Sequence, residues 1–337
     1  MGPDKIATVH LKHIGPAGIE YLTHIFNLSL KFSQIPDIWK TSKIIPLLKP
    51  GKDPTESKSY RPVSLLCPAI KIMERLILPT LTQHLPVPDI QHGFRKDHST
   101  VTALHEFNQQ IAQGFNQRKP AHRTVLLQLD LSKAFDMVSH NKLLSKDLNT
   151  TTLPPEFKRW FGCYLHGRQS RVLFRNETST ARNVRTGVLQ GAVTSPILFN
   201  FYLANLPPPP AGVAVMQYAD DMSVYSSGVK IPDMTARINS YVPSLLDFLR
   251  ERELEFSAEK STVTLFTPAS GEAGIHPQVL VDGKLVKLEK EPKLLGVVFD
   301  TMYTFGKHAK QNLTKGKSKI NILKQLAETQ WGQDKKH

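Results

Sequence analysis

Two adjacent carboxylates, Asp220 and Asp221, interrupt an apolar, β-prone stretch, AVMQYADDMSV, at residues 214–224. Like charges held side by side repel each other, by roughly 1 kcal/mol at 4 Å in water and about 4 kcal/mol near a protein surface. The flanking residues predict two short strands, so the pair would lie at the tip of a hairpin. Taken alone, the stretch is also compatible with an ordinary polar turn, because Asp is a common turn residue.

A third carboxylate, Asp130, lies near the end of the stretch RTVLLQLDLS, at residues 123–132. This stretch predicts a buried strand, because apolar residues surround the single acidic charge: Val125, Leu126, Leu127, Leu129 and Leu131. If this strand neighbours the hairpin in one sheet, three carboxylates converge at its edge. Divalent cations would relieve their repulsion, and Mg²⁺ prefers one or two carboxylates plus substrate phosphates. Two such ions can activate a 3′-hydroxyl and stabilise a leaving pyrophosphate.

The order of the predicted elements fits a sheet that would hold these residues. Helices are expected at 17–32, 70–85, 99–118, 141–149, 155–166, 195–206 and 233–252. Pro79 should interrupt one of these helices and Pro243 should kink another. Further strands are expected at 168–174, 182–188 and 293–300, a loop and strand at 255–267, and a Pro-, Lys- and Gly-rich loop at 45–62. This order is the one that a split βαβ sheet requires.

The composition indicates a globular protein. The chain has 337 residues, of which 40% are hydrophobic and 21% charged, enough for two or three lobes with substantial cores. No run of apolar residues is long enough for a membrane span. The two cysteines, Cys67 and Cys163, form no zinc-binding pattern and indicate a reducing compartment. The 13 histidines are scattered and suggest no metal-binding cluster.

The net charge of +14 favours a polyanionic partner, although a generally basic, soluble surface is an alternative. The positive excess is concentrated at residues 301–337. This segment contains eight lysines and two acidic residues, Glu328 and Asp334, for a net charge of 8 − 2 = +6. Apolar residues recur among these lysines at near-helical spacing: Leu313, Ile320, Ile322, Leu323 and Leu326. We expect this segment to be a helix that grips a phosphate backbone.

Three blocks of the sequence resemble the central motifs of reverse transcriptases, in the same order and at fitting spacing. They are LDLSKAFDMVSH (129–140), GVLQGAVTSPILFNFYL (187–203) and YADD (218–221). The resemblance is closest to non-LTR (LINE-type, jockey-like) retrotransposons, and it continues in WKTSKIIPLLKPGK, SYRPVSLL, QHGFRKDHST, EKSTVTLF and KLLGVVFD. It therefore covers nearly the whole chain.

The resemblance implies an α+β right-hand polymerase with helical fingers, a split βαβ (ferredoxin-like) palm and a helical thumb. The expected division is an N-terminal helical extension at 1–30, fingers and palm at 31–300, and the start of a basic thumb at 301–337. The implied function is RNA-directed DNA synthesis with two Mg²⁺ or Mn²⁺ ions, an RNA template, a DNA primer and dNTPs, as part of retrotransposition. The chain would be a fragment of a polyprotein, with endonuclease activity expected from a separate or missing segment.

The resemblance also assigns roles by position. Asp130 and Asp220 would be the principal metal ligands, with Asp221 the third acidic residue, and Lys260 would protonate pyrophosphate. Phe135 would lie under the incoming sugar and leave no room for a 2′-hydroxyl. The remaining substrate-binding residues would be Leu131, through its carbonyl, Gln190, Gly191 and Tyr218, with Arg61, Lys71 and Arg95 holding the triphosphate. Asp136 would make a structural hydrogen bond.

Two of these residues have alternative interpretations. Phe135 could be a core residue, and Lys260 could be a solvated loop lysine. Leu189, Ala192 and Thr194 depart from the residues usual in the family, Pro, Gly and an apolar residue respectively. A decayed copy that binds RNA or template-primer without efficient turnover is therefore the alternative function. An RNA-templated RNA polymerase is disfavoured by Phe135.

Overall fold

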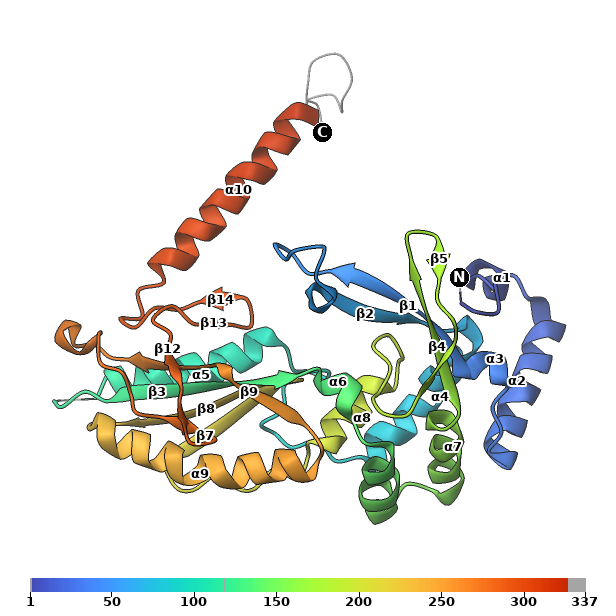
Figure 1. The fold of residues 1–337 in the computed structure, drawn as a ribbon, viewed down its shortest axis with the longest axis horizontal. Coiled ribbons are helices and arrows are strands. Elements are labelled where there is room, and N and C mark those ends of the chain that lie inside the picture. The colour runs from blue at the N-terminus through green and yellow to red at the C-terminus, as the bar shows by residue number, and fades with distance from the viewer. Residues whose placement is uncertain (1, 118, 327–337) are drawn as a thin grey trace.

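The computed structural model describes residues 2–117 and 119–326 and shows a mixed α+β fold with two larger sheets (Figure 1). One five-stranded sheet has the order β12-β9-β3-β8-β7. Its strands are β3 (Arg123–Ser132), β7 (Val213–Tyr218), β8 (Asp221–Gly228), β9 (Glu255–Phe266) and β12 (Lys287–Leu288). β3 pairs antiparallel with both β8 and β9, and β8 pairs antiparallel with β7. The predicted strand at 123–132 is therefore confirmed, and it is central in its sheet.

The two faces of this sheet belong to different cores, because successive side chains of a strand point to opposite faces. Leu127 and Leu129 of β3 belong to the larger core, together with Leu245 and Leu249 of α9 (Ile231–Glu251). Leu126 belongs to a second core on the other face, with α5 (Thr100–Phe115). In Figure 1, α9 and α5 lie on opposite sides of the sheet. The near-continuous apolar run of β3 follows from this burial on both faces.

The second large sheet has the order β2-β1-β4-β5, with β6 also paired to β4. Its strands are β1 (Thr41–Leu48), β2 (Tyr60–Leu65), β4 (Arg168–Phe174), β5 (Glu177–Thr178) and β6 (Arg182–Val184). The prediction of a loop over 45–62 was wrong at both ends, since β1 and β2 form a hairpin there. β1 also pairs in parallel with β4, more than a hundred residues later, and such distant pairing is not visible in a local sequence pattern.

Helices pack around both sheets. The remaining helices are α1 (Thr8–Lys12), α2 (Gly15–Phe32), α3 (Asp37–Lys40), α4 (Pro68–His84), α6 (Ala134–Met137), α7 (Pro155–Leu165), α8 (Ser195–Tyr202) and α10 (Gly306–Leu326). Short 3₁₀ or π turns occupy Ser57–Ser59, Lys142–Asp147, Leu148–Thr150 and Ser270–Glu272. Two further pairs of short strands are β10 (Leu280–Val281) with β11 (Lys284–Leu285), and β13 (Lys293–Leu294) with β14 (Val297–Val298).

Several local predictions need correction. α4 runs through Pro79 without the predicted interruption. The strand expected at 293–300 is instead the hairpin β13–β14, because Leu295 and Gly296 both have positive φ angles and reverse the chain there. The helix expected at 141–149 is a π turn followed by a 3₁₀ turn.

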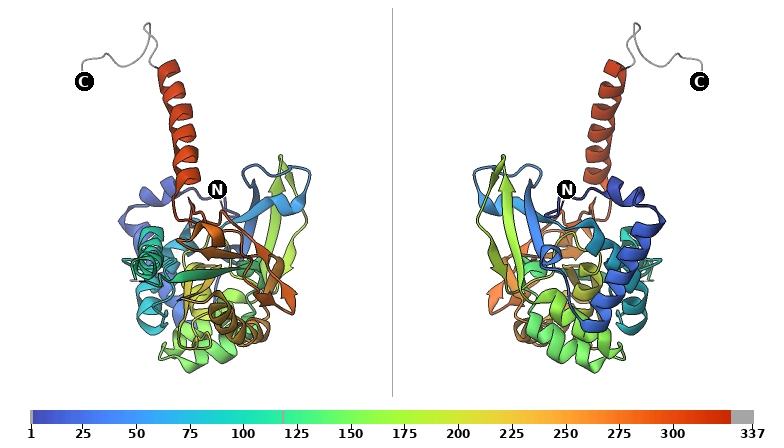
Figure 2. Two further views of the ribbon diagram at one scale, coloured as in Figure 1. Left: turned by 90° about the vertical axis from the view of Figure 1, so that its left-hand side faces the viewer. Right: turned by 90° about the vertical axis from the view of Figure 1, so that its right-hand side faces the viewer.

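α10 projects away from the body of the protein, as both views of Figure 2 show. From 301 to 326 the chain carries six lysines and no acidic residue. Leu313, Ile320 and Leu323 are exposed on this helix. The predicted helix is confirmed up to residue 326; Glu328, Asp334 and the last two lysines lie outside the described residues.

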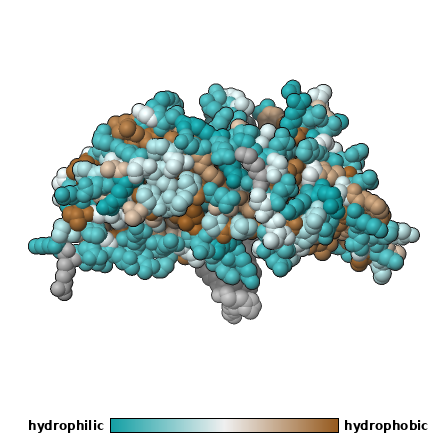
Figure 3. All heavy atoms as spheres, turned by 90° about the horizontal axis from the view of Figure 1, so that it is seen from below, coloured by the Kyte–Doolittle hydropathy of each residue, from teal (hydrophilic) through white to brown (hydrophobic). Residues whose placement is uncertain are grey.

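The face of the protein seen in Figure 3 is largely hydrophilic, with separate apolar patches. Within the described part of the chain, no helix combines the length and the apolar character that crossing a membrane would require.

Candidate active site

Asp130 and Asp221 lie directly opposite each other on the paired strands β3 and β8. Asp220 precedes Asp221 in the two-residue turn that joins β7 to β8. The other turn residue, Ala219, has a φ of 56°, a left-handed conformation that costs free energy for a residue with a side chain. The sheet thus brings Asp130 to the pair Asp220 and Asp221, about ninety residues later in the sequence, as the patterns of the two stretches predicted.

The electrostatics of the site follow from this proximity. Desolvation and, after it, the negative charges of Asp220 and Asp130 together raise the pKa of Asp221 to about 6. Desolvation also raises the pKa of Asp220, with a contribution from Asp130, while its own backbone N–H and the Arg61 guanidinium act in the opposite sense. Both side chains are exposed, yet the surrounding protein removes part of their hydration. The site therefore favours a bound cation or a proton.

The residues fit a hard divalent cation in their donor chemistry. One oxygen of Asp130, Oδ2, is buried and accepts no hydrogen bond, and the Nζ of Lys260 lies 3.5 Å from it. Carboxylate oxygens are the ligands that Mg²⁺ prefers. Among residues 2–117 and 119–326, however, no three or more His, Cys, Asp or Glu side chains are arranged to enclose a metal. The carboxylates would need substrate phosphates or waters to complete a coordination shell.

An irregularity in β9 brings Lys260 to Asp130. The register of β9 shifts here, because Gln128 pairs with Thr262 whereas Asp130 pairs with Ser257. Between these two pairs, one residue of β3, Leu129, thus opposes four residues of β9, 258–261, and the extra residues form a bulge. The hydroxyl of Ser261 donates to the Ser257 carbonyl at 2.7 Å and accepts from the Asp130 N–H at 3.3 Å, which holds the bulge against β3.

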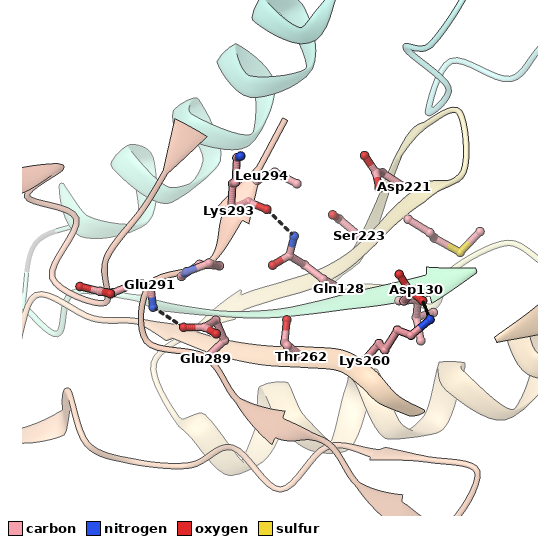
Figure 4. Close-up of a pocket in the computed structure, with 13 residues that line it drawn as sticks. Gln128, Asp130, Asp221, Ser223, Lys260, Thr262, Glu289, Glu291, Lys293 and Leu294 are labelled. Carbon is pink, nitrogen blue, oxygen red and sulfur yellow. Dashed lines mark hydrogen bonds and ion pairs between the residues drawn. The ribbon is translucent and has the colours of Figure 1, made fainter. Parts of the chain in front are cut away.

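A cavity of about 310 Å³ opens beside Asp130, Asp221 and Lys260 (Figure 4). Sequence reasoning missed most of its other lining residues: Gln128, Ser223, Thr262, Glu289, Glu291 and Lys293. Two of them could have been found from the two-residue period of a strand. By this period Gln128 shares a face of the sheet with Asp130, and Ser223 shares one with Asp221. The Gln128 amide donates to the Lys293 carbonyl at 3.3 Å, so the β13–β14 hairpin closes one side of the cavity.

The turn at Leu189–Ala192 packs against β2. The Ser64 N–H donates to the Gln190 carbonyl at 2.7 Å, and a Cβ atom at Gly191 would lie 2.5 Å from the Ser64 carbonyl oxygen. Gly191 is therefore required by the close approach of two backbones. The Gln190 amide also donates to the Asp136 carboxylate at 3.2 Å.

Phe135 lies between two other aromatic rings. Its ring stacks on Phe199 of α8, with centroids 4.3 Å apart and planes 15° from parallel. The exposed ring of Phe94 meets it edge-on at 6.4 Å. Leu131 is buried, and Tyr218 packs at the edge of the second core.

The basic residues proposed for a triphosphate are not all in one place. The positive charge of Arg61, on β2, acts to lower the pKa of Asp220. The positive charge of Lys71, on α4, instead acts to lower the pKa of the buried Glu74. Arg95 forms an ion pair with Asp89 at 2.7 Å and lines a separate cavity with Phe94 and Ile197. The structure thus brings Arg61, but not Arg95, to the acidic turn.

The sequence matches the reverse transcriptase (RNA-dependent DNA polymerase) family over residues 47–299, which is most of the chain. The chain belongs to the reverse transcriptase family. The matched region contains all three carboxylates, the β9 bulge and the β13–β14 hairpin.

Similar proteins include transposon enzymes of Drosophila melanogaster. The chain is 30% identical over 336 residues to the probable RNA-directed DNA polymerase from transposon BS, covering 96% of this chain and 36% of that protein. It is 30% identical over 318 residues to the RNA-directed DNA polymerase from mobile element jockey, covering 91% and 34% respectively. The chain thus spans about a third of the length of the curated relatives that it matches.

Among solved structures, an apo telomerase from Candida tropicalis, truncated from the C-terminal domain, aligns with 85% of this chain and 59% of its own. The TM-score is 0.49, at 10% sequence identity.

Proposed function

We propose that the chain is an RNA-directed DNA polymerase, which transfers dNMP from a dNTP to the 3′-hydroxyl of a primer on an RNA template. The observation that carries the proposal is the pairing of Asp130 with Asp221 at one edge of the sheet, next to Asp220. In this reaction the primer 3′-oxygen bonds to the α-phosphorus, the bond to the β-phosphate breaks, and pyrophosphate leaves with its electron pair. When bound by these carboxylates, two Mg²⁺ or Mn²⁺ ions would activate the hydroxyl and stabilise the leaving group.

The other residues have roles that their positions support. Lys260, held beside Asp130, is suited to give a proton to the departing pyrophosphate. Arg61, which acts on Asp220 from β2, is suited to hold the triphosphate. Phe135, held flat by Phe199, would exclude a 2′-hydroxyl. Lys71, Gln190, Gly191, the Leu131 carbonyl and Tyr218 complete the proposed substrate site.

The strand order supports a right-hand polymerase. Taken in chain order, β3, β7, β8 and β9 are arranged β9-β3-β8-β7, with α8 and α9 in the connections, as in a split βαβ palm. The second sheet with its surrounding helices would be the fingers, within 31–300, after a helical extension at 1–30. The basic helix α10 would begin a thumb at 301–337 that binds the RNA–DNA duplex.

The alternative is a protein that binds RNA or template-primer but turns over poorly. The observation that favours it is the departure from the family pattern at Leu189 and Ala192, in the turn that packs against β2.

Primer extension separates the two functions. The purified chain is incubated with poly(rA)/oligo(dT), dTTP and Mg²⁺, and Asp130→Asn serves as the control. Extension by the wild type and not by the variant supports the polymerase. Template-primer binding without extension, in either Mg²⁺ or Mn²⁺, supports the alternative.

A further inference from the structure

The acidic turn is held by a segment that lies far from it in the sequence. Gln91–Gly93 runs alongside the end of β7, where Gln91 forms a parallel bridge with Gln217. Backbone hydrogen bonds join the two segments on both sides, from the Gln217 N–H to the Ile90 carbonyl at 2.8 Å and from the His92 N–H to the Gln217 carbonyl at 2.9 Å. The segment therefore acts as a short additional strand at the edge of the sheet.

The side chain of Gln91 binds the backbone of the turn itself. Its Oε1 accepts from the Ala219 N–H at 2.9 Å, and its Nε2 donates to the Ala219 carbonyl at 3.4 Å. The same Oε1 accepts from the Gly93 N–H at 2.8 Å, which fixes the amide in place. Gln91 is fully buried, so water cannot replace these partners.

Ala219 is the residue that needs such support. It has a φ of 56° and directly precedes Asp220. A left-handed alanine is strained by roughly 1–2 kcal/mol, and strain of this kind persists only where surrounding groups enforce it. The Gln91 amide satisfies both polar groups of this one residue, and so it stabilises the conformation that aims Asp220 and Asp221.

The segment is itself held from the opposite side. The Asn200 side chain of α8 donates to the Gly93 carbonyl at 2.7 Å. A Cβ atom at Gly93 would lie 2.5 Å from the Ala219 nitrogen, so only glycine allows this approach. A chain of contacts therefore runs from α8 through Gly93 and Gln91 to the turn.

From these contacts we infer that Gln91 is a positioning residue for the catalytic carboxylates, which fixes the Ala219 turn through its side-chain amide. This inference rests on the proposed polymerase function only for its consequence, since the hydrogen bonds can be tested without turnover. Gln91 does not touch substrate or metal in this role. It acts through the orientation of Asp220 and Asp221.

The chain offers a matched control. Gln217 is also a buried glutamine beside the turn, but neither its Oε1 nor its Nε2 has a hydrogen-bond partner. Methionine has nearly the same shape as glutamine and lacks the amide. Gln91→Met therefore removes the hydrogen bonds from the Gln91 amide to Ala219 and Gly93, which together form a clamp on the turn. Gln217→Met removes an amide that has no hydrogen-bond partner.

The first measurement is hydrogen–deuterium exchange of a peptide that covers residues 214–224. In Gln91→Met we expect exchange at Ala219 to accelerate at least about tenfold, because its N–H loses its acceptor. Gln217→Met should leave the rate within twofold of the wild type. Equal rates in wild type and Gln91→Met would overturn the inference, whether or not the chain polymerises.

The second measurement is steady-state extension on poly(rA)/oligo(dT). For Gln91→Met we expect kcat to fall about 10- to 100-fold and the Mg²⁺ concentration for half-maximal rate to rise severalfold, while KM for dTTP changes less than threefold. Gln217→Met should change none of these more than twofold. An equal loss in both variants, or a loss that appears only in the melting temperature, would show that Gln91 is merely structural. If the wild type does not extend the primer, the proposed function is wrong. The exchange measurement then still tests whether Gln91 holds the turn.

Asn200→Leu keeps the inference testable if Gln91→Met does not fold. The Oδ1 of Asn200 has no partner, so this variant loses only the bond to the Gly93 carbonyl. We expect the same changes in exchange and in Mg²⁺ dependence, smaller by severalfold. A folded Asn200→Leu with wild-type exchange at 214–224 and wild-type Mg²⁺ dependence would contradict the chain of contacts.

Discussion

Asp130 and Asp221 face each other across the β3–β8 pair, on the face of the sheet that also carries Gln128 and Ser223. Like charges directly opposite each other destabilise a sheet. The pairing is therefore unfavourable for folding and is explained by what the carboxylates bind.

Asp130→Asn and Asp220→Asn should each abolish primer extension. Each removes a charge that the cations require, and we expect kcat to fall by at least about a thousandfold, or about 4 kcal/mol of transition-state stabilisation. The dissociation constant for template-primer should stay within about threefold of the wild type. Asp233→Asn, the same change at an exposed position at the start of α9, is the control and should retain full activity. Substantial extension by Asp220→Asn would remove this residue from the catalytic site.

Asp221→Asn should stabilise the protein when divalent ions are absent and the pH is above 6. Partial desolvation and the neighbouring carboxylates raise the pKa of Asp221 to about 6 in the folded state, from 3.8 in the unfolded chain. Between these values the folded state holds the proton and the unfolded state does not, so the wild type loses stability as the pH rises from about 4 to about 6.

The melting temperature with EDTA measures this effect. Because solvent screens an exposed carboxylate, we expect the variant to melt only about 2 °C higher at pH 8. The two proteins should melt together at pH 4. A difference that is constant with pH would mean that the charge of Asp221 is not its cause.

Phe135→Val should admit ribonucleotides. The ring would act by exclusion, so trimming it should raise kcat/KM for GTP relative to dGTP by one to two orders of magnitude, or about 1.4–2.8 kcal/mol. A smaller loss of dGTP activity should accompany the change, because the stack on Phe199 is lost. Phe199→Leu is the control, since it removes the stacking partner but keeps the Phe135 ring. If both substrates lose activity together in Phe135→Val, the residue is part of the core and not a gate.

Replacing Lys315, Lys317 and Lys319 with Gln should weaken template-primer binding and flatten its salt dependence. All three are exposed on α10, where no acidic residue offsets them up to residue 326. The slope of log K against log salt should fall by up to about 0.9 for each phosphate contact removed. As a control, Lys5, Lys12 and Lys31 are also exposed, near the N-terminus, and their replacement should leave the slope unchanged. An unaltered slope in the α10 variant would mean that these lysines are only solvated.

The sequence by itself determined the strand that carries Asp130, the hairpin that carries Asp220 and Asp221, and the amphipathic helices α5 and α9. Each of these depends on a local pattern: alternation or continuous apolarity in a strand, and a 3.6-residue period in a helix. The order of the motifs around them also indicated the reverse transcriptase family. The loop predicted over 45–62 failed because β1 and β2 depend on pairing with each other and with β4, and Pro, Lys and Gly obscured their strand character.

Only the tertiary structure decided which side chains meet. The bulge that brings Lys260 to Asp130 is a difference in register between two strands, and a single strand's sequence does not contain it. Arg61 and Arg95 look alike in the sequence, but the fold places the first beside Asp220 and pairs the second with Asp89. The Gln91 amide reaches Ala219 across 128 residues of chain, and nothing local distinguishes it from Gln217, whose side chain binds nothing. Hydrogen bonds between segments so far apart follow from how the sheet edge assembles, and that depends on the whole chain.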